Sequence, residues 1–315
     1  MVSMIASQLE DFERRIASEL RSEVAFIEAI GSELVGAGGK RLRPSLAFLA
    51  GELLDARRED TMQVALAVEL LHSASLLHDD LIDDADTRRG AKAAFRRYGN
   101  VVSVMSGDYL LARVLGLLAR VGSSAFTELM STTAARICEG EVLQFQMATL
   151  ETWDSSVYQS VIEGKTAVLF AAAVEGVALV AGADVATRAA LRDYGMAFGR
   201  AFQLRDDYLD LLGEHTALGK PIGGDLRDGK VTMPVLTLIE DGIAEALAIV
   251  RRHAGDHGDV ERMIALVREH GGDLRTKRAI AAEVELATRA LARLPTGAAR
   301  DALAALPLAE LERLS

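Results

Sequence analysis

Apolar stretches such as "ALAVELLHSAS" (residues 65–75) recur along the chain, and almost none shows the apolar–polar alternation of a half-buried strand. None of the five prolines lies between Ser45 and Lys220, so helices in that region meet no proline stop. Alanine and leucine dominate these stretches, and both are good helix formers. The pattern predicts an all-α fold.

Glycines and prolines between the apolar stretches set the expected helix ends. We expect helices at about 3–30, 45–54, 61–86, 101–120, 123–150, 155–180 and 186–212, and shorter ones after Thr232. The polar segment "GEHTALGKPIGGDLRDGK" reads as a loop. With no internal repeat or linker, the sequence predicts a single helical domain over residues 1–315.

Composition excludes several classes of protein. The net charge of −11 argues against nucleic acid as the main partner. Cys138 is the single cysteine, so no internal disulfide forms, and a reducing, cytoplasmic location is expected. Acidic residues interrupt the N-terminal 20 residues, which argues against a signal peptide. The most apolar window, residues 166–183, contains Glu175 and is too short for a membrane span, so none is expected.

The motif DDxxD occurs twice, each time near the end of an apolar helix. The first cluster consists of Asp79, Asp80 and Asp83, and the second of Asp206, Asp207 and Asp210. Residues three and four apart share one helix face, so the carboxylates within each cluster are neighbours. The plain alternative is a solvated acidic helix end, but two matching clusters on helices of one bundle favour a shared site.

Carboxylates without His or Cys suit hard cations, and Mg²⁺ binds one or two carboxylates together with phosphate oxygens and water. The two clusters therefore predict a Mg²⁺-dependent diphosphate site. An EF-hand is excluded because Arg89 occupies the place of its glycine, and "GKT" is not a P-loop because residue 159 is glutamine.

A diphosphate also requires cations, and basic residues lie in glycine-rich turns near both clusters. They are Lys40, Arg41, Arg43, Arg88, Arg89, Lys165 in "GKT", Lys220 and Lys230. Taken singly, each is more often a solvated surface charge.

Seven motifs agree in type and order with one family: "GGKRLRP", "HSASLLHDDLIDDADTRRG", "GDYLLA", "GEVLQ", "GKTA", "FQLRDDYLD" and "GKPIGGDLRDGKVTMP". Together they resemble the trans-isoprenyl diphosphate synthases of the polyprenyl synthetase family. The resemblance covers about residues 38–234. It implies a bundle of long helices around a deep central cavity, a homodimer, and loose membrane association through product release.

The resemblance also implies roles for individual residues. Asp79, Asp83 and Asp206 match ligands of three Mg²⁺ ions, with Asp80, Asp207 and Asp210 beside them. Lys40, Arg43, His72 and Arg89 match the residues that bind isopentenyl diphosphate. Arg88, Lys165, Thr166, Gln203, Lys220 and Lys230 match those around the allylic diphosphate. The family joins these two substrates head to tail, giving an all-trans polyprenyl diphosphate.

Other functions remain as alternatives. A terpene cyclase needs no second diphosphate site, so "GGKRLRP" with His72 counts against it. An HD-type phosphohydrolase is suggested by His72, His78 and Asp79, but its chemistry needs histidine as a metal ligand. A subunit of a heteromeric prenyl synthase is disfavoured because both aspartate clusters are complete.

Product length is expected to depend on the residues just before the first cluster. Ser75 lies one turn before Asp79 on the same helix face, with Ala74 beside it. In short-chain family members this pair usually includes an aromatic residue that closes the tunnel. Both residues are small here, which resembles octaprenyl diphosphate synthases and predicts a hexaprenyl to decaprenyl product. The alternative is a farnesyl or geranylgeranyl product, with Phe126 or Met105 closing the tunnel.

Overall fold

The computed structural model describes residues 2–36, 41–84, 87–88, 91–213 and 222–312. The chain forms two compact units, each built from three segments. Unit 1 contains residues 1–134, 169–192 and 293–303, and unit 2 contains residues 135–168, 193–292 and 304–315. A single domain over residues 1–315 stays a prediction.

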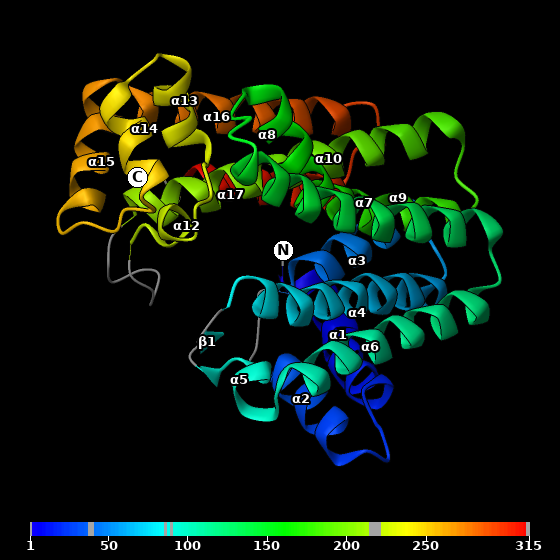
Figure 1. Cartoon of the computed structure of the whole chain (residues 1–315). Helices are drawn as coiled ribbons and strands as arrows, with labels where there is room; N and C mark the ends of the chain where they lie inside the picture. Colours follow the sequence, from blue (N-terminus) through cyan, green and yellow to red (C-terminus); the bar gives the residue numbers. More distant parts are fainter. Residues whose placement is uncertain (1, 37–40, 85–86, 89–90, 214–221, 313–315) are drawn as a thin grey trace. The chain divides into compact units, whose positions relative to one another are not determined.

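Unit 1 is a layered set of helices with one very short hairpin. Its elements are α1 (Val2–Glu19), α2 (Ala25–Gly36), α3 (Leu42–Leu54), α4 (Arg58–Ile82), β1 (Thr87–Arg88), β2 (Ala91–Lys92), α5 (Ala94–Tyr98), α6 (Asn100–Val121), the start of α7 (Ser124–Thr149), most of α9 (Val168–Val180), the start of α10 (Val185–Leu212) and the start of α17 (Ala298–Glu312). Helix α4 packs against α3 and α6 (Figure 1). The antiparallel strands pair Thr87 with Lys92.

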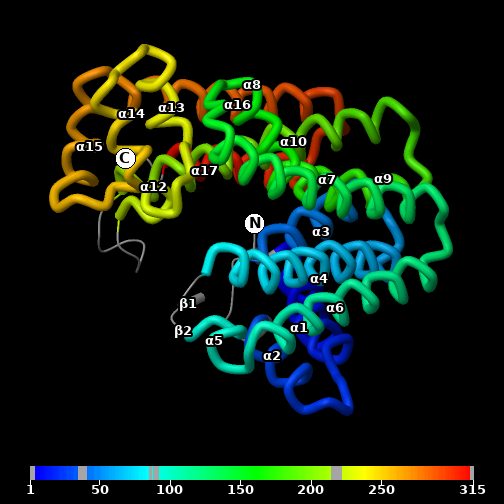
Figure 2. Tube along the Cα trace, viewed as in Figure 1, coloured from blue at the N-terminus to red at the C-terminus, as the bar shows by residue number. Residues whose placement is uncertain are grey.

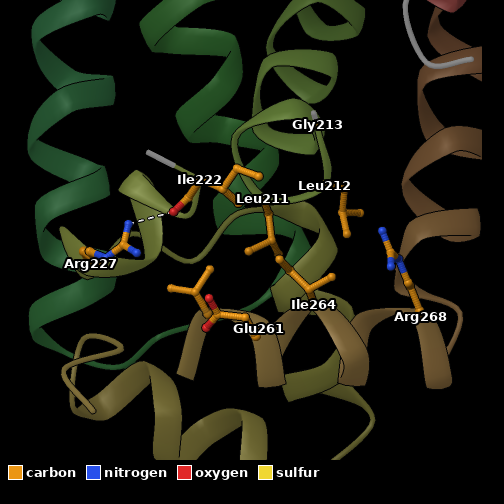
Figure 3. Close-up of a pocket in the computed structure, with 9 residues that line it drawn as sticks. Leu211, Leu212, Gly213, Ile222, Arg227, Glu261, Ile264 and Arg268 are labelled. Carbon is orange, nitrogen blue, oxygen red and sulfur yellow. Dashed lines mark hydrogen bonds between the residues drawn. The ribbon is translucent and has the colours of Figure 1, made fainter. Parts of the chain in front are cut away.

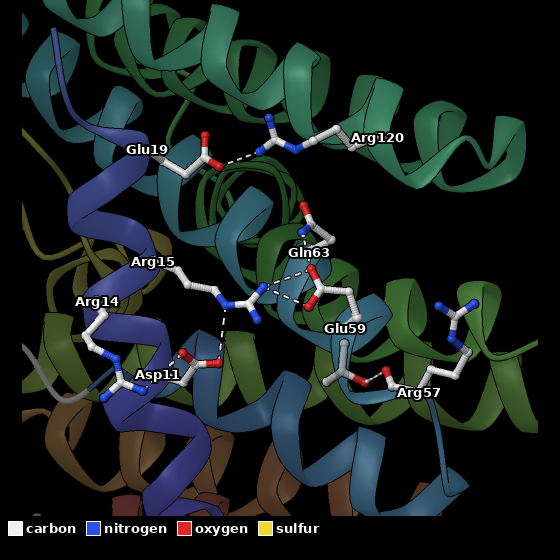
Figure 4. A network of polar contacts seen from close by, with 9 residues as sticks. Asp11, Arg14, Arg15, Glu19, Arg57, Glu59, Gln63 and Arg120 are labelled. Carbon is white, nitrogen blue, oxygen red and sulfur yellow. Dashed lines mark hydrogen bonds and ion pairs between the residues drawn. The ribbon is translucent and has the colours of Figure 1, made fainter.

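Within unit 1, helix α1 contacts the other helices through an apolar face and a polar edge. Phe12 is fully buried and meets Phe48 edge to face, with ring centroids 6.2 Å apart. On the polar edge, Arg15 donates to both carboxylate oxygens of Glu59 at 2.8 Å (Figure 4). Glu19 pairs with Arg120 of α6 in the same network. Helix α1 is therefore an integral part of the fold.

Unit 2 contains the remaining helices. They are the end of α7, α8 (Ser155–Ile162), the π-helix η1 (Glu163–Ala167), most of α10 (Val185–Leu212), α12 (Gly224–Arg227), α13 (Met233–Glu240), α14 (Ala244–Arg251), α15 (Asp259–Glu269), α16 (Gly272–Leu291) and the end of α17. Helix α13 packs against α14, α15 and α16 (Figure 2). Trp153, the one tryptophan of the chain, is half-buried against the apolar core of this unit.

The all-α prediction is confirmed, with the hairpin as a small addition. Three predicted helices differ from those observed. The helix expected at 61–86 begins at Arg58 and ends at Ile82, with Asp83 as its C-cap. The helix expected at 3–30 ends at Glu19, because Ser22 Oγ accepts from the Val24 N–H at 3.1 Å and offers the backbone a turn instead. The helix expected at 155–180 widens into η1 at residues 163–167.

Of the described helices, α6 alone is long and apolar enough to span a membrane, judged by length and composition. In the structure 39% of its apolar window is buried, and it packs against α4.

Candidate active site

The first aspartate cluster lies at the C-terminal end of α4. Asp83 is the C-cap, and its N–H donates to the Asp79 carbonyl at 2.8 Å, so these two residues lie one turn apart. Both are half-buried, whereas Asp80 is buried. The last turn of α4 contains no basic residue. Carboxylates at the negative end of a helix dipole are unfavourable without cations, so this cluster suits a positively charged ligand.

Helix α6 fixes the end of α4 that carries this cluster. Ser103 Oγ donates to the Leu77 carbonyl at 3.3 Å. The His78 ring lies 3.3 Å from the Val104 carbonyl and 3.5 Å from an Asp108 oxygen. A Cβ on Gly107 would lie 2.3 Å from His78 Nε2, so the glycine makes room for the ring. His78 therefore contacts α6, which counts against the HD-type metal site.

The second cluster lies in the last two turns of α10 and includes a buried chain of hydrogen bonds. Thr166 Oγ1 donates to Gln203 Oε1 at 2.6 Å, and Gln203 Nε2 donates to Asp207 Oδ1 at 2.8 Å. The Tyr158 hydroxyl donates to the other Asp207 oxygen. Burial, and then the charge of Asp225, raises the pKa of Asp207 to about 7. Asp207 is therefore held inside the unit, with both oxygens engaged.

Asp206 and Asp210 have different surroundings. The Asp206 side chain is 45% exposed and is paired with the neighbouring Arg205, whose Nε lies 3.0 Å from Oδ1. Asp210 Oδ2 accepts from the Asp225 N–H of α12 at 3.1 Å. Burial, and then Asp225, raises the pKa of Asp210 to about 7. Asp225 thus joins the cluster as a fourth carboxylate.

The π-helix η1 presents Lys165 and Thr166 through a close contact with α7. A Cβ on Gly140 would lie 2.6 Å from the Lys165 backbone nitrogen. Lys165 Nζ lies 2.6 Å from a Glu141 oxygen and 3.1 Å from Gln144 Oε1. A π-turn inside an α-helix is frequent at functional sites. The hydrogen bond between Thr166 and Gln203 places "GKT" beside the second cluster.

Among the basic residues of unit 1, Arg41 and Arg43 have distinct surroundings. Arg41 pairs with Glu13 at 2.6 Å and with Glu69 at 3.0 Å, which is a structural role. Arg43 is half-buried in the first turn of α3, with its guanidinium 4.8 Å from the Phe170 ring centroid. Of these two arginines, Arg43 therefore stays the candidate for substrate binding.

The other predicted site residues are placed as follows. His72 is half-buried on α4, and its carbonyl accepts from Ser75 Oγ at 2.9 Å. Ala74 is buried. Lys230 is largely buried, with Nζ 3.7 Å from an Asp228 oxygen. Lys40, Arg89 and Lys220 lie outside the described residues, as does the side chain of Arg88.

Sequence reasoning missed four residues that contact the site: Glu141, Gln144, Tyr158 and Asp225. Glu141 and Gln144 belong to the motif "GEVLQ", and Asp225 belongs to "GGDLRDGK". The sequence therefore showed these motifs, but it did not show what these three residues do. Tyr158 carried no signal, because only the fold brings it to Asp207.

A cavity of about 310 Å³ lies where α10 ends, beside residues 222–227 and α15 (Figure 3). Its lining includes the apolar Leu211, Val260 and Ile264 together with Glu261. Arg227 and Arg268 lie on opposite sides of it. Arg227 donates to the Ile222 carbonyl at 2.7 Å. Among the described residues, none of the predicted site residues lines this cavity.

The donors present suit a divalent cation bound together with a phosphate. Among the described residues, no three His, Cys, Asp or Glu side chains converge as a complete ion site. Mg²⁺ needs only one or two carboxylates when phosphate oxygens and water supply the rest. The half-buried Asp79 and Asp83 and the accessible Asp206 offer such carboxylates.

Comparison with known proteins agrees with this chemistry. The Polyprenyl synthetase family matches residues 24–267. The octaprenyl diphosphate synthase of Haemophilus influenzae is 36% identical over 97% of this chain and 94% of its own length.

Two solved structures cover the whole chain. A polyprenyl synthase from Caulobacter crescentus, complexed with calcium and isoprenyl diphosphate, is 37% identical with a TM-score of 0.93 over 96% of its chain. A decaprenyl diphosphate synthase from Rhodobacter capsulatus is 36% identical with a TM-score of 0.94 over 98% of its chain. The fold is that of the isoprenoid synthases, and the chain belongs to the polyprenyl synthetase family.

Proposed function

We propose that this chain is a Mg²⁺-dependent trans-polyprenyl diphosphate synthase that joins isopentenyl diphosphate to an allylic diphosphate. One observation carries the proposal. Two carboxylate clusters lie at the C-terminal ends of two helices of a polyprenyl synthetase, where the helix dipole already disfavours negative charge. A diphosphate bound with Mg²⁺ is the ligand that these carboxylate donors fit.

Asp79, Asp83 and Asp206 are the proposed direct ligands of three Mg²⁺ ions. Their carboxylates are reachable from solvent, whereas Asp80 is buried and both Asp207 oxygens accept hydrogen bonds from side chains. We assign Asp80, Asp207 and Asp210 to supporting positions in the clusters. Mg²⁺, when bound, neutralises charge on the allylic diphosphate.

The basic and polar residues are proposed to hold the two substrates. Lys40, Arg43, His72 and Arg89 bind isopentenyl diphosphate, and Arg88, Lys165, Thr166, Gln203, Lys220 and Lys230 bind the allylic diphosphate. In unit 2, Thr166 and Gln203 share a hydrogen bond, and Lys165 is held by Glu141. These contacts fix the side chains before substrate arrives, which lowers the cost of binding.

Catalysis follows from charge that develops on the leaving group. As the allylic carbon–oxygen bond breaks, negative charge grows on the diphosphate, and Lys165 and Lys230 stabilise that charge more than the ground state. The double bond of isopentenyl diphosphate attacks the allylic cation. The family transfers the last proton to the departed diphosphate, so no side chain is assigned as a base.

A long-chain product is proposed from α4. Ala74 and Ser75 lie one turn before the first cluster, and Ser75 folds its hydroxyl back onto the His72 carbonyl. Both side chains are small, which leaves room for a growing chain. A hexaprenyl to decaprenyl product follows, with a farnesyl or geranylgeranyl product as the alternative.

We also propose a cytoplasmic homodimer. In unit 1, helix α6 exposes Val101, Met105 and Leu115, with exposed fractions of 55% or more. In unit 2, α7 exposes Val142 and Phe145. Exposed apolar side chains that gather on one helix mark interaction surfaces, and a second copy of the chain would cover them.

The test is incubation of the purified chain with Mg²⁺, radiolabelled isopentenyl diphosphate and farnesyl diphosphate. Asp79→Asn and Asp206→Asn should each abolish most incorporation of label. Asp301→Asn removes the same charge at a 74% exposed position of α17 and serves as the control. Full activity in either cluster variant would refute the metal assignment, and a cyclic hydrocarbon product would favour the terpene cyclase.

A further inference from the structure

Arg205 is a buried guanidinium that the mechanism above does not use. It lies on α10 immediately before Asp206 and is 3% exposed. It contacts the Asp206 carboxylate, with Nε 3.0 Å from Oδ1, and it forms an ion pair with Glu310 of α17. Its guanidinium also lies 4.4 Å from the Phe202 ring centroid. One cation is therefore shared between two carboxylates.

The two carboxylates differ in access. Glu310 is 5% exposed, so its charge depends on Arg205 for compensation. Asp206 is 45% exposed on its side chain, so an ion from solvent can reach it. Side chains of adjacent helix residues do not normally face each other, so the Arg205–Asp206 contact requires the Arg205 side chain to turn toward its neighbour.

We propose that Arg205 is an internal counter-ion that competes with the divalent metal for Asp206, and that Glu310 sets the strength of this competition. The inference rests on the proposed function, because it takes Asp206 as a metal ligand. Arg205 neutralises Asp206 while no metal is bound, and Glu310 draws part of the guanidinium charge away. Arg205 is thus a positioning residue, and the end of α17 tunes the second cluster.

Two substitutions should therefore shift metal affinity in opposite directions. Glu310→Gln leaves Asp206 as the only anionic partner of Arg205 among the contacts described, which strengthens that pair and weakens metal binding. Arg205→Met frees Asp206 and tightens metal binding. A shift of about threefold to tenfold is expected in each case, because Asp206 is half exposed and solvent screens the pair. A purely structural role would weaken binding in both variants.

The experiment measures Mn²⁺ binding to the full chain in the presence of inorganic pyrophosphate, by calorimetry and by the paramagnetic signal of free Mn²⁺. Arg205→Met leaves Glu310 buried without its partner, so Arg205→Met/Glu310→Met is measured beside it to keep the fold intact. Arg278→Met and Glu312→Gln remove the same charges at exposed positions of α16 and α17 and serve as matched controls.

Tighter Mn²⁺ binding in Arg205→Met and in the double variant, with weaker binding in Glu310→Gln, supports the inference. Shifts in one direction only, or no shift beyond the controls, overturn it. Asp206→Asn separates this failure from that of the proposed function. If Asp206→Asn leaves the isotherm unchanged, the metal assignment fails and the inference with it. If it weakens binding while the Arg205 and Glu310 variants do not diverge, only the inference fails.

Discussion

Gly140→Ala tests whether the close contact between α7 and η1 positions the allylic site. The added Cβ would lie 2.6 Å from the Lys165 backbone nitrogen and 2.9 Å from the Gly164 carbonyl carbon. Ordinary contacts between heavy atoms need about 3.5–4.0 Å, so one backbone must move by roughly 1 Å. Both nearest atoms belong to the backbone, which cannot yield by changing a rotamer.

The expected loss of stability is the difference between two opposing effects. Overpacking of a tight contact costs about 1–3 kcal/mol. Alanine within a helix gains about 1 kcal/mol over glycine. The free energy of unfolding should therefore fall by up to about 2 kcal/mol, as measured by urea denaturation. A displacement of about 1 Å at Lys165 should lower kcat/KM by roughly 100-fold, measured as incorporation of isopentenyl diphosphate.

Gly116→Ala provides the matched control. Gly116 lies inside α6, and the nearest heavy atom to its added Cβ would be a flexible Arg120 nitrogen at 3.9 Å. This variant should gain about 1 kcal/mol of stability and keep its activity. Wild-type stability and activity in Gly140→Ala would refute the positioning role of the contact.

Three further predictions follow from the site. Arg43→Ala should raise the KM for isopentenyl diphosphate about tenfold to 100-fold, as expected for a lost charged hydrogen bond. Lys230→Ala should raise the KM for the allylic substrate by a similar factor. Equal effects of both variants on both substrates would contradict the assignment. Ser75→Phe should shorten the product to about farnesyl or geranylgeranyl length, resolved by chromatography. Ala74→Tyr, at a buried position, should shorten it in the same way. Unchanged products in both variants would contradict the long tunnel. Burial raises the pKa of Asp207 to about 7. The folded, metal-free protein thus holds a proton that unfolding releases, and the free energy of unfolding should fall by up to about 4 kcal/mol as pH rises from about 4 to about 7. Urea titrations across this range check the trend, and a constant or rising stability contradicts it.

Most helices could be predicted from the sequence because local signals determine them. The proline-free stretch and the glycine punctuation gave helix ends within a few residues at α6, α7 and α10. The break after Glu19 was missed because it depends on the Ser22 hydroxyl capturing a backbone N–H. The π-turn at 163–167 was missed because it accommodates α7, a neighbour that local sequence does not reveal.

The site was predictable to the extent that its residues share one helix. Spacings of three and four placed the carboxylates of each cluster together without any tertiary information. The motif could not show that Asp206 is exposed beside Arg205 while Asp207 is buried under Tyr158. The same limit affected stability. Asp206→Asn relieves repulsion within the cluster, but the ion pair with Arg205 means that this variant also loses an attraction.

The position of Trp153 makes the chain its own spectroscopic probe. The only indole packs against the core of unit 2, so tryptophan fluorescence follows the unfolding of that unit. Far-ultraviolet circular dichroism follows the helices of both units. Coincident transitions from the two signals would identify one cooperative folding domain, as the sequence predicts, because a two-state transition looks the same to every probe. A fluorescence transition separated from the dichroism transition would show that the units unfold independently.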